Sequence, residues 1–218
     1  MKSMTRIAII SDVHCHHENL KRFLRKEKDN IDIILSAGDI VGYRYQIDET
    51  IELFEKHKIQ SIKGNHDKYA LKEIKPTIHK RSLQESIDMT AKYLSHEALE
   101  YLRCLPDTLD IEIDGIRVIL NHGSFESSEE YLFKEDILGT IEKQRKKGLL
   151  KEAFYFFGHT HLPYWIYCKG IVVANPGSIG FPKKNAQPSY IIIDSSKCLQ
   201  SEEVKSGIHY FLMRNLKK

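Results

Sequence analysis

The first 63 residues alternate between strand-like and helix-like patterns, and this alternation limits the folds that the chain can adopt. Apolar runs at 5–11, 31–37 and 59–63 are typical of strands, and residues 17–28 and 46–57 carry apolar side chains at helical spacing. Strands that alternate with helices along a chain form a mainly parallel sheet. We therefore predict such a sheet in the N-terminal half.

The C-terminal half is predicted to contain more strands. Two helical patterns occupy residues 83–105, and Pro106 ends the second one. Alternation on both sides of Asp114-Gly115 predicts a hairpin with a two-residue turn, and a charged helix is expected around 128–147. Further short strands are expected near 153–157, 164–168, 171–174 and 189–194. No Pro/Gly/Ser-rich linker divides the 218 residues, so we expect a single domain over 1–218.

Composition excludes several classes of protein. The chain is 41% hydrophobic and 29% charged, as in an ordinary globular protein. Its 33 basic and 30 acidic side chains leave a net charge of +3, which is too small to predict a nucleic-acid partner. The apolar runs are far shorter than the roughly 18 residues of a membrane span, and the N-terminus lacks the apolar core of a signal peptide. We therefore expect a cytoplasmic protein with no membrane partner.

The cysteines do not form a recognisable metal or redox motif. They are far apart in the sequence, at Cys15, Cys104, Cys168 and Cys198. Without a CxxC pair, neither a zinc ribbon nor a dithiol redox site is predicted, and free thiols are expected.

Five predicted strands run directly into a group of Asp, His or Asn residues. The groups are SDVHCHH (11–17), AGDIVG (37–42), GNHD (64–67), NHG (121–123) and GHTH (158–161). In an extended segment, residues two apart point the same way, so Asp12 and His14 can reach one ion. Ligands of α/β sheets gather beyond the carboxyl ends of the strands. The five groups are therefore predicted to meet at one site.

Each group taken alone has an ordinary structural explanation. A single Asp12 or Asp39 after a strand is commonly a helix cap or a turn residue, and a single His14 or His122 is commonly a hydrogen-bonded, half-buried histidine. Five such groups at corresponding strand ends favour a shared site. The other histidines fit no pattern and are interpreted as surface or capping residues: His16, His17, His57, His79, His96 and His209.

The candidate ligands are too many for one ion. They are Asp12, His14, Asp39, Asn65, His122, His159 and His161. We therefore predict two adjacent divalent ions, with Asp39 as a candidate to bridge them. Carboxylate, amide and imidazole donors without cysteine favour Mn²⁺, with Fe, Zn and Ni as alternatives. Two such ions suit the hydrolysis of a phosphate ester, and His66 is in a position to protonate the leaving group.

The motifs DVH, GDIVG, GNHD, NHG and GHTH, in this order and spacing, resemble the calcineurin-like metallophosphoesterase family. The stretches LDIEIDGIRVILNHGS and ANPGSIGFPK are similar to its small bacterial and archaeal phosphodiesterase branch. The resemblance implies an α/β fold, a four-layer αββα sandwich of two mixed sheets with a binuclear metal site at the strand ends. It assigns Asp12, His14 and His161 to the first ion, Asn65, His122 and His159 to the second, and Asp39 to both. His66 matches the family's catalytic histidine.

The chain departs from the family pattern near the predicted site. Cys15 and His16 replace the usual glycine and asparagine of the first motif. Gly42 stands where the protein phosphatases of the family carry an aspartate that supports the catalytic histidine. Arg44 is interpreted as a solvated loop residue, although it is also a candidate for contact with phosphate. The lysine-rich stretch 68–82 is interpreted either as a basic lip for anionic substrates or as a solvated loop.

These observations favour a binuclear metal-dependent hydrolase that acts on small phosphorylated substrates, with diesters slightly favoured by the branch resemblance. The alternatives are a phosphomonoesterase or protein phosphatase, a catalytically silent scaffold with the same fold, and a nuclease. The oligomeric state and the substrate are left open by the sequence, because the ligands fix the reaction while the surrounding loops fix the leaving group.

Overall fold

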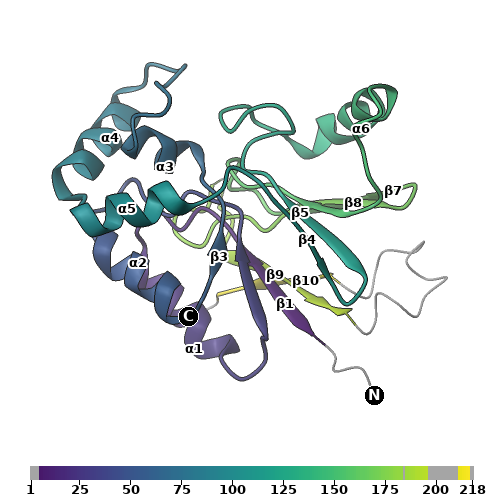
Figure 1. Ribbon diagram of the computed structural model, residues 1–218, viewed down its shortest axis with the longest axis horizontal. Helices are drawn as coiled ribbons and strands as arrows, with labels where there is room; N and C mark the ends of the chain where they lie inside the picture. Colours follow the sequence, from purple (N-terminus) through teal and green to yellow (C-terminus); the bar gives the residue numbers. More distant parts are fainter. Residues whose placement is uncertain (1–4, 184, 196–210, 217–218) are drawn as a thin grey trace.

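The computed structural model describes residues 5–183, 185–195 and 211–216, so Cys198 and His209 lie outside the described residues. Two five-stranded sheets pack face to face at the centre of the molecule (Figure 1). The first sheet runs in the order β10 (Phe211–Asn215), β9 (Ser189–Asp194), β1 (Arg6–Ile10), β2 (Ile33–Ser36) and β3 (Gln60–Ser61). The second runs in the order β4 (Leu109–Ile113), β5 (Ile116–Leu120), β6 (Phe154–Phe156), β8 (Ile171–Asn175) and β7 (Tyr164–Cys168).

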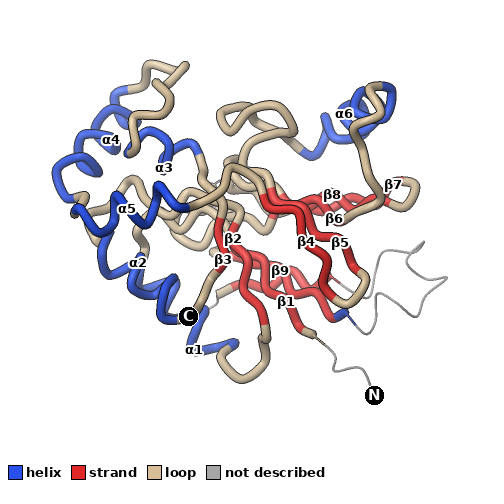
Figure 2. Tube along the Cα trace, in the orientation of Figure 1, coloured by secondary structure: helices blue, strands red, loops and turns tan. Residues whose placement is uncertain are grey.

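Helices cover the outer faces of both sheets (Figure 2). The first sheet is covered by α1 (His17–Glu27), α2 (Ile47–Lys56) and α5 (His96–Cys104), and α3 (Asn65–Ala70) and α4 (Arg81–Tyr93) lie beside these helices. The second sheet is covered by α6 (Ile137–Lys146), which follows the 3₁₀ turn η1 (Lys134–Asp136). None of the described helices is long and apolar enough to cross a bilayer.

Side-chain alternation in the strands builds three separate cores. In β1, Ile7 and Ile9 point into the core between the two sheets, whereas Ala8 and Ile10 point to the helices. In β8, Val172 and Ala174 face the same inter-sheet core, and Ile171 and Val173 face α6. Three apolar cores between four layers confirm the predicted αββα sandwich.

The strand directions confirm the predicted topology. β1, β2 and β3 are mutually parallel, and β9 joins β1 antiparallel. In the second sheet β5, β6 and β8 are parallel. The β4–β5 hairpin turns through Asp114 and Gly115, which both have positive φ (51° and 80°), as a type I′ turn requires.

Three local predictions differ from the structure. The helix expected around 128–147 begins only at η1, because Tyr131 and Leu132 leave the helical path, Tyr131 to stack on His159 and Leu132 to enter the core behind α6. The short helix α3 begins at Asn65, where only a loop was expected. Strand β10 was not anticipated, since its residues FLMRN carry no strong alternation.

Candidate metal centre

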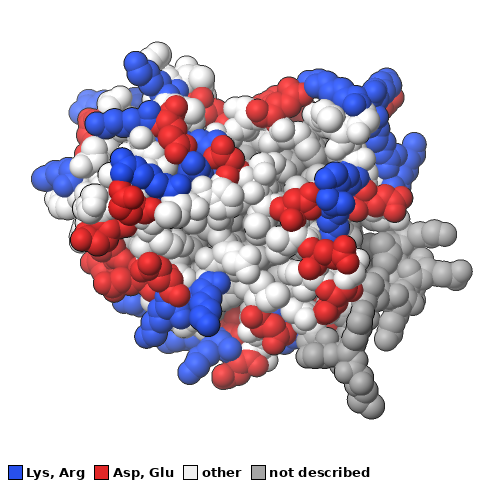
Figure 3. All heavy atoms as spheres, viewed as in Figure 1, with Lys and Arg blue, Asp and Glu red and all other residues white. Residues whose placement is uncertain are grey.

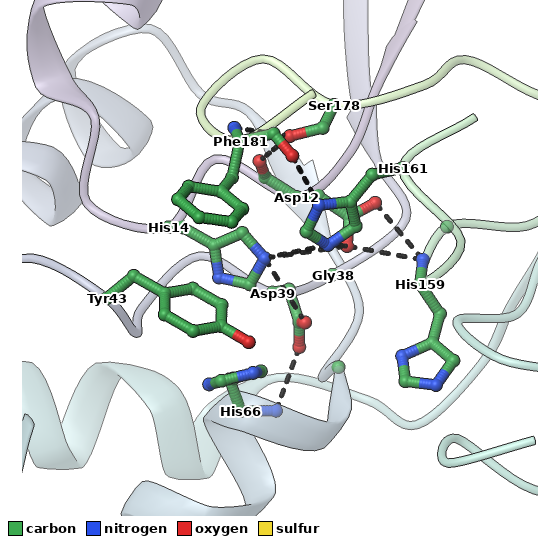
Figure 4. A network of polar contacts seen from close by, with 12 residues as sticks. Asp12, His14, Gly38, Asp39, Tyr43, His66, His159, His161, Ser178 and Phe181 are labelled. Carbon is green, nitrogen blue, oxygen red and sulfur yellow. Dashed lines mark hydrogen bonds and ion pairs between the residues drawn. The ribbon is translucent and has the colours of Figure 1, made fainter. Parts of the chain in front are cut away.

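The five polar groups lie together at one edge of the sandwich. They follow the carboxyl ends of β1, β2, β3, β5 and β6. Because the first three strands are parallel in one sheet and the last two are parallel in the other, these ends meet where the sheets pack. In Figure 4, Asp12 and His14 come from the loop after β1, Asp39 from the loop after β2, His159 and His161 from the loop after β6, and His66 from the start of α3.

The side chains form two overlapping groups whose ligand atoms lie within 4.8 Å of one another. The first group is Asp12, His14, Asp39 and His161, and the second is Asp39, His122 and His159. Asn65 adjoins the second group, since its Oδ1 lies 3.0 Å from His122 Nε2. The structure thus brings together all seven candidate ligands, with Asp39 common to both groups. Their role as ligands stays a prediction.

Backbone carbonyls orient three of the imidazoles toward the centre. Nδ1 of His14 donates to the carbonyl of Val41 at 3.0 Å, and Nδ1 of His122 donates to that of Ala37 at 2.7 Å. Nδ1 of His161 likewise donates to a carbonyl, that of Phe181. In neutral imidazole the other nitrogen then carries a lone pair. His14 and His161 therefore present Nε2 as an acceptor, as a metal site requires, and His122 does so when its ring is neutral.

The fourth imidazole has the opposite orientation. Nε2 of His159 donates to the carbonyl of Glu129 at 3.1 Å, so Nδ1 is the nitrogen left for the centre. The ring stacks on Tyr131 with centroids 4.1 Å apart. Hydrogen bonding and stacking together hold this ring in one orientation.

The unpaired atoms at the centre fit divalent cations. Nε2 of His14 and Nε2 of His161 lie 3.1 Å apart, although each nitrogen carries a lone pair in the tautomer that the carbonyls select. Oδ2 of Asp39 is buried without a hydrogen-bond partner, 3.6 Å from His14 Nε2 and 3.3 Å from His122 Nε2. A buried carboxylate oxygen without a partner is costly unless a cation binds it. The donor set therefore fits a metal centre with Asp39 between two positions.

The electrostatics support this interpretation. Burial lowers the pKa of His14 and of His159 to about 3, so both rings are neutral and able to bind a metal. Burial opposes charge on His122 as well, but the carboxylate of Asp39 outweighs it and raises the pKa of His122 to about 9. Burial also opposes the charge of Asp12 and Asp39, yet the surrounding histidines hold the pKa of both carboxyls well below the usual range. The centre thus retains negative charge that attracts cations.

Five of the seven candidate ligands adopt left-handed backbone conformations. The φ values are 52° for Asp12, 47° for His14, 56° for Asp39, 63° for His159 and 59° for His161. Such conformations cost a non-glycine residue roughly 1–2 kcal/mol each and cluster at functional sites. The fold therefore imposes the geometry of this centre at the expense of local stability.

The sequence of the chain matches a known family over most of its length. Residues 5–197 match the calcineurin-like phosphoesterase superfamily domain. The chain belongs to this superfamily. The buried Asp/His cluster described above is consistent with a metal site in such a phosphoesterase.

Individual relatives agree with the family. The chain is 31% identical to the uncharacterized protein MJ0912 of Methanocaldococcus jannaschii, over 89% of this chain and 84% of that protein. It is 25% identical to the phosphodiesterase MJ0936 of the same organism, over 79% and 82% of the two chains. The crystal structure of a metallophosphoesterase from Sphaerobacter thermophilus superposes with a TM-score of 0.70 and 25% identity, over 94% and 95% of the two chains. These findings confirm the predicted resemblance to small phosphoesterases.

Asp67 organises the calcineurin-like centre and was missed in the sequence. Its fully buried carboxylate accepts backbone N–H groups from Asp39 (2.9 Å), Ile40 (3.3 Å), Val41 (3.0 Å) and Gly64 (2.9 Å). It thereby ties the loop after β2 to the start of α3. Burial, together with the charge of Asp39, raises the pKa of Asp67. The sequence signal for Asp67 was its position as the last residue of the GNHD motif.

His66 lies beside the two groups with an unusual supporting residue. Gly42 has a φ of 106°, and a Cβ there would lie 2.5 Å from His66 Nδ1, so an aspartate at this position would strain the backbone and displace the ring of His66. Instead Ser86 of α4 places its Oγ 3.5 Å from His66 Nδ1, while the same Oγ accepts the N–H of Tyr43 at 2.8 Å. His66 therefore has Ser86 beside Nδ1, where the protein phosphatases of the family have a supporting aspartate.

The remaining departures are structural. Cys15 is completely buried, and burial raises the pKa of its thiol, so an oxidation-sensitive thiolate is excluded there. His16 caps α1 by accepting the N–H of Asn19. Arg44 is exposed and does not line the cleft over the centre, as the solvated interpretation predicted. Of the other histidines, His17 and His57 are partly exposed and His79 and His96 are exposed. The described cysteines, Cys15, Cys104 and Cys168, are free thiols.

A cleft of about 300 Å³ opens over the centre between aromatic walls. On one side Tyr43 and Phe181 stack with centroids 4.9 Å apart and 9° between the rings. Tyr131, which stacks on His159, also lines the cleft. Aromatic side chains around the cleft would help to exclude water from a reacting group.

Two lysines from distant segments line this metal cleft. Lys80 comes from the stretch 68–82, and Lys183 comes from the loop before β9. Nζ of Lys183 lies 5.5 Å from the ring centroid of Tyr131, and burial lowers the pKa of this lysine despite the nearby charges of Asp12 and Asp39. Part of the predicted basic lip therefore does face the centre.

Proposed function

We propose that this protein is a phosphoesterase that hydrolyses small phosphate esters with two divalent metal ions, Mn²⁺ being favoured. The observation that carries the proposal is Oδ2 of Asp39, which is buried without a hydrogen-bond partner and belongs to both groups of candidate metal-binding side chains. A single ion in the first group would leave the second group, Asp39, His122 and His159, without a cation of its own. Membership of the phosphoesterase superfamily supplies the class of reaction.

The chain's own side chains suffice to hold both ions. Asp12, His14, Asp39 and His161 would hold one, and Asp39, Asn65, His122 and His159 would hold the other. Ions bound there would supply Lewis acidity to the phosphoryl group and to an attacking water. The carbonyl partners of the histidines fix the ring orientations in advance.

His66 is the group that would assist departure of the leaving oxygen. Its ring lines the metal cleft and lies 4.9 Å from that of His14, centroid to centroid. Nδ1 faces Ser86, which leaves Nε2 to donate to an ester oxygen. Asp39 contributes to the position of His66, because its Oδ1 accepts the backbone N–H of His66 at 2.9 Å.

A preference for diesters is part of the proposal. It is supported by similarity to a protein named as a phosphodiesterase, and by Gly42, which stands where protein phosphatases of the family have an aspartate. Similarity to a protein named serine/threonine-protein phosphatase 2 from Escherichia coli, 24% identical over 70% of this chain, favours monoesters instead. Comparison of kcat/KM for activated diesters and monoesters decides between them.

The test is hydrolysis of bis-p-nitrophenyl phosphate and p-nitrophenyl phosphate by metal-free protein reloaded with Mn²⁺, Fe²⁺, Zn²⁺ or Ni²⁺. We expect about two ions per chain by elemental analysis and faster cleavage of the diester. His122→Ala should abolish cleavage, whereas His96→Ala, an exposed histidine of α5, should not. Two bound ions without cleavage of either ester would indicate a silent scaffold, and failure to bind metal would refute the proposal.

A further inference from the structure

A second cavity adjoins the metal cleft. It has a volume of about 610 Å³ and lies between the segment 72–81 and helix α4, and we call it the α4 cavity. Tyr69, Ile78, Lys80 and Leu83 line both the metal cleft and the α4 cavity, so the two spaces are direct neighbours. Its volume lies in the range of small-molecule sites, roughly 300–1,000 Å³. A substrate held over the metals can therefore extend into it.

The floor of the α4 cavity is apolar and partly open to solvent. Ile74, Leu83 and Ile87 line it and are only half-buried, and Ile78 at its entrance is 43% exposed. Binding of a ligand that removes such apolar surface from water is favourable. The floor thus suits an apolar body such as a planar ring.

The rim of the α4 cavity is basic, and nearby acids are engaged elsewhere. Glu73 points to Lys63, with oxygens 2.9 and 3.1 Å from its Nζ, and Glu85 binds Arg81. Within the part of the chain that the structure describes, the rim lysines Lys72, Lys75 and Lys80 form no ion pair. The cavity therefore suits a ligand with negative charge in addition to an apolar body.

The segment that roofs the cavity is anchored to the loop before η1. Oε1 of Glu129 accepts the hydroxyl of Tyr69 at 2.6 Å and the backbone N–H of Thr77 at 3.0 Å. The backbone carbonyl of Glu129 also accepts the N–H of His159 Nε2 in the metal centre. The same residue therefore fixes the position of the cavity roof relative to the centre.

We propose that the α4 cavity binds one ester arm of the substrate, and that this arm is an apolar ring system carrying a further negative charge, as in a phosphorylated nucleoside. The inference rests on the proposed phosphoesterase function and narrows its substrate class to nucleotide-like diesters. Lys and Arg side chains alternate with Asp and Glu on the surface shown in Figure 3, which favours a small nucleotide over a long nucleic-acid strand.

The test uses three p-nitrophenyl diesters that share one leaving group. Their second arms are methyl, thymidine, and thymidine with a 3′-phosphate. In the wild-type protein, kcat/KM should rise by at least about tenfold from methyl to thymidine, through burial of the ring, and further with the 3′-phosphate. Nuclease-like cleavage of long single strands at a higher kcat/KM than the thymidine 3′-phosphate diester would overturn the inference.

Two variants locate the binding arm. Ile87→Trp fills the α4 cavity without touching the metal cleft, so it should remove the gain from thymidine and leave the methyl ester unchanged. Lys75→Ala should lower the gain from the 3′-phosphate by about fivefold, as expected for loss of one partly screened ionic contact. Lys92→Ala, also on α4 but outside the cavity, is the matched control and should change neither gain.

The outcomes separate this inference from the proposed function. If the methyl ester is cleaved but both gains persist in Ile87→Trp, or are absent from the wild type, the inference is wrong and the proposed function stands. If no ester is cleaved, the proposed function is wrong, and calorimetry with thymidine 3′,5′-bisphosphate then tests the cavity alone. Equal affinity of the wild type, Ile87→Trp and Lys75→Ala for that ligand would overturn the inference. Circular dichroism verifies that each variant is folded.

Discussion

Replacing Asp67 by asparagine tests how the metal-binding loops are held together. Oδ2 of Asp67 accepts three N–H groups and Oδ1 accepts the fourth, from Val41. In Asp67→Asn the amide oxygen can replace Oδ2, but the amide nitrogen then faces the N–H of Val41 and has no lone pair to offer. Leaving this buried donor unsatisfied should cost about 1–3 kcal/mol of the free energy of unfolding.

The cost should shrink as the pH rises. Because burial and the charge of Asp39 raise the pKa of Asp67, the native state keeps this proton after the unfolded chain, with a pKa of about 3.9, has lost it. The stability that this proton confers is complete below that value and is lost as the pH rises, by up to about 1.4 kcal/mol per pH unit. Asparagine has no such proton to lose, so the destabilisation by Asp67→Asn should vanish within about two pH units above the unfolded pKa, near about pH 6.

The assay is urea unfolding of metal-free protein in a chelator, followed by the fluorescence of Trp165, at several values between about pH 4 and pH 8. Asp107→Asn is the matched control, since this aspartate is 61% exposed and should change stability by no more than about 0.5 kcal/mol. A cost of Asp67→Asn that is the same at every pH would show that the four N–H donors keep the carboxyl ionised. That result would refute the reasoning.

Three further predictions concern the site and the surface. Because Ser86 contacts Nδ1 of His66, Ser86→Ala should lower kcat by about tenfold for esters with a poor leaving group and much less for p-nitrophenyl esters. Ser86→Thr should restore kcat. An equal loss of kcat on both types of ester would indicate a merely structural role for the serine. Mn²⁺ at about 100 times its Kd should stabilise the protein in urea unfolding by about 2.7 kcal/mol for each bound ion, and His122→Ala should reduce this stabilisation. The hydrogen bonds of Arg117 lower the pKa of Asp110 to about 2, so its contribution to stability is present above the usual aspartate pKa and is lost as the pH falls through about 2. Carboxyl NMR titration should find that low pKa, which Arg117→Gln should raise.

The architecture was predictable because it depends on periodicity. Parallel strands and their helices follow from apolar patterns that tertiary contacts reinforce, and the Asp114-Gly115 turn follows from the backbone preferences of two residues. The segment 128–133 was mispredicted as helix because its aromatic residues are used elsewhere. Tyr131 packs on a histidine 28 positions further along the chain, and no local pattern reveals such a contact.

The sequence predicted the side chains of the candidate site, but not the groups that orient them. Asp and His residues after successive strands are visible in the sequence, since strand ends are themselves predictable. The carbonyls that orient His14 and His122 belong to Val41 and Ala37, and any residue supplies a carbonyl. Ser86 reaches His66 from a helix that no motif marks, so its role appears only when the chain is folded.

The left-handed backbone at five of the candidate ligands makes stability and activity competing traits. Glycine is the residue that adopts this conformation without strain, so replacing Asp12, His14, Asp39, His159 or His161 by glycine relieves a local cost while it removes a donor. Directed evolution for heat resistance alone should therefore enrich glycine at these positions. The selected variants would become more heat-stable and would lose the side chains of the candidate metal centre one at a time.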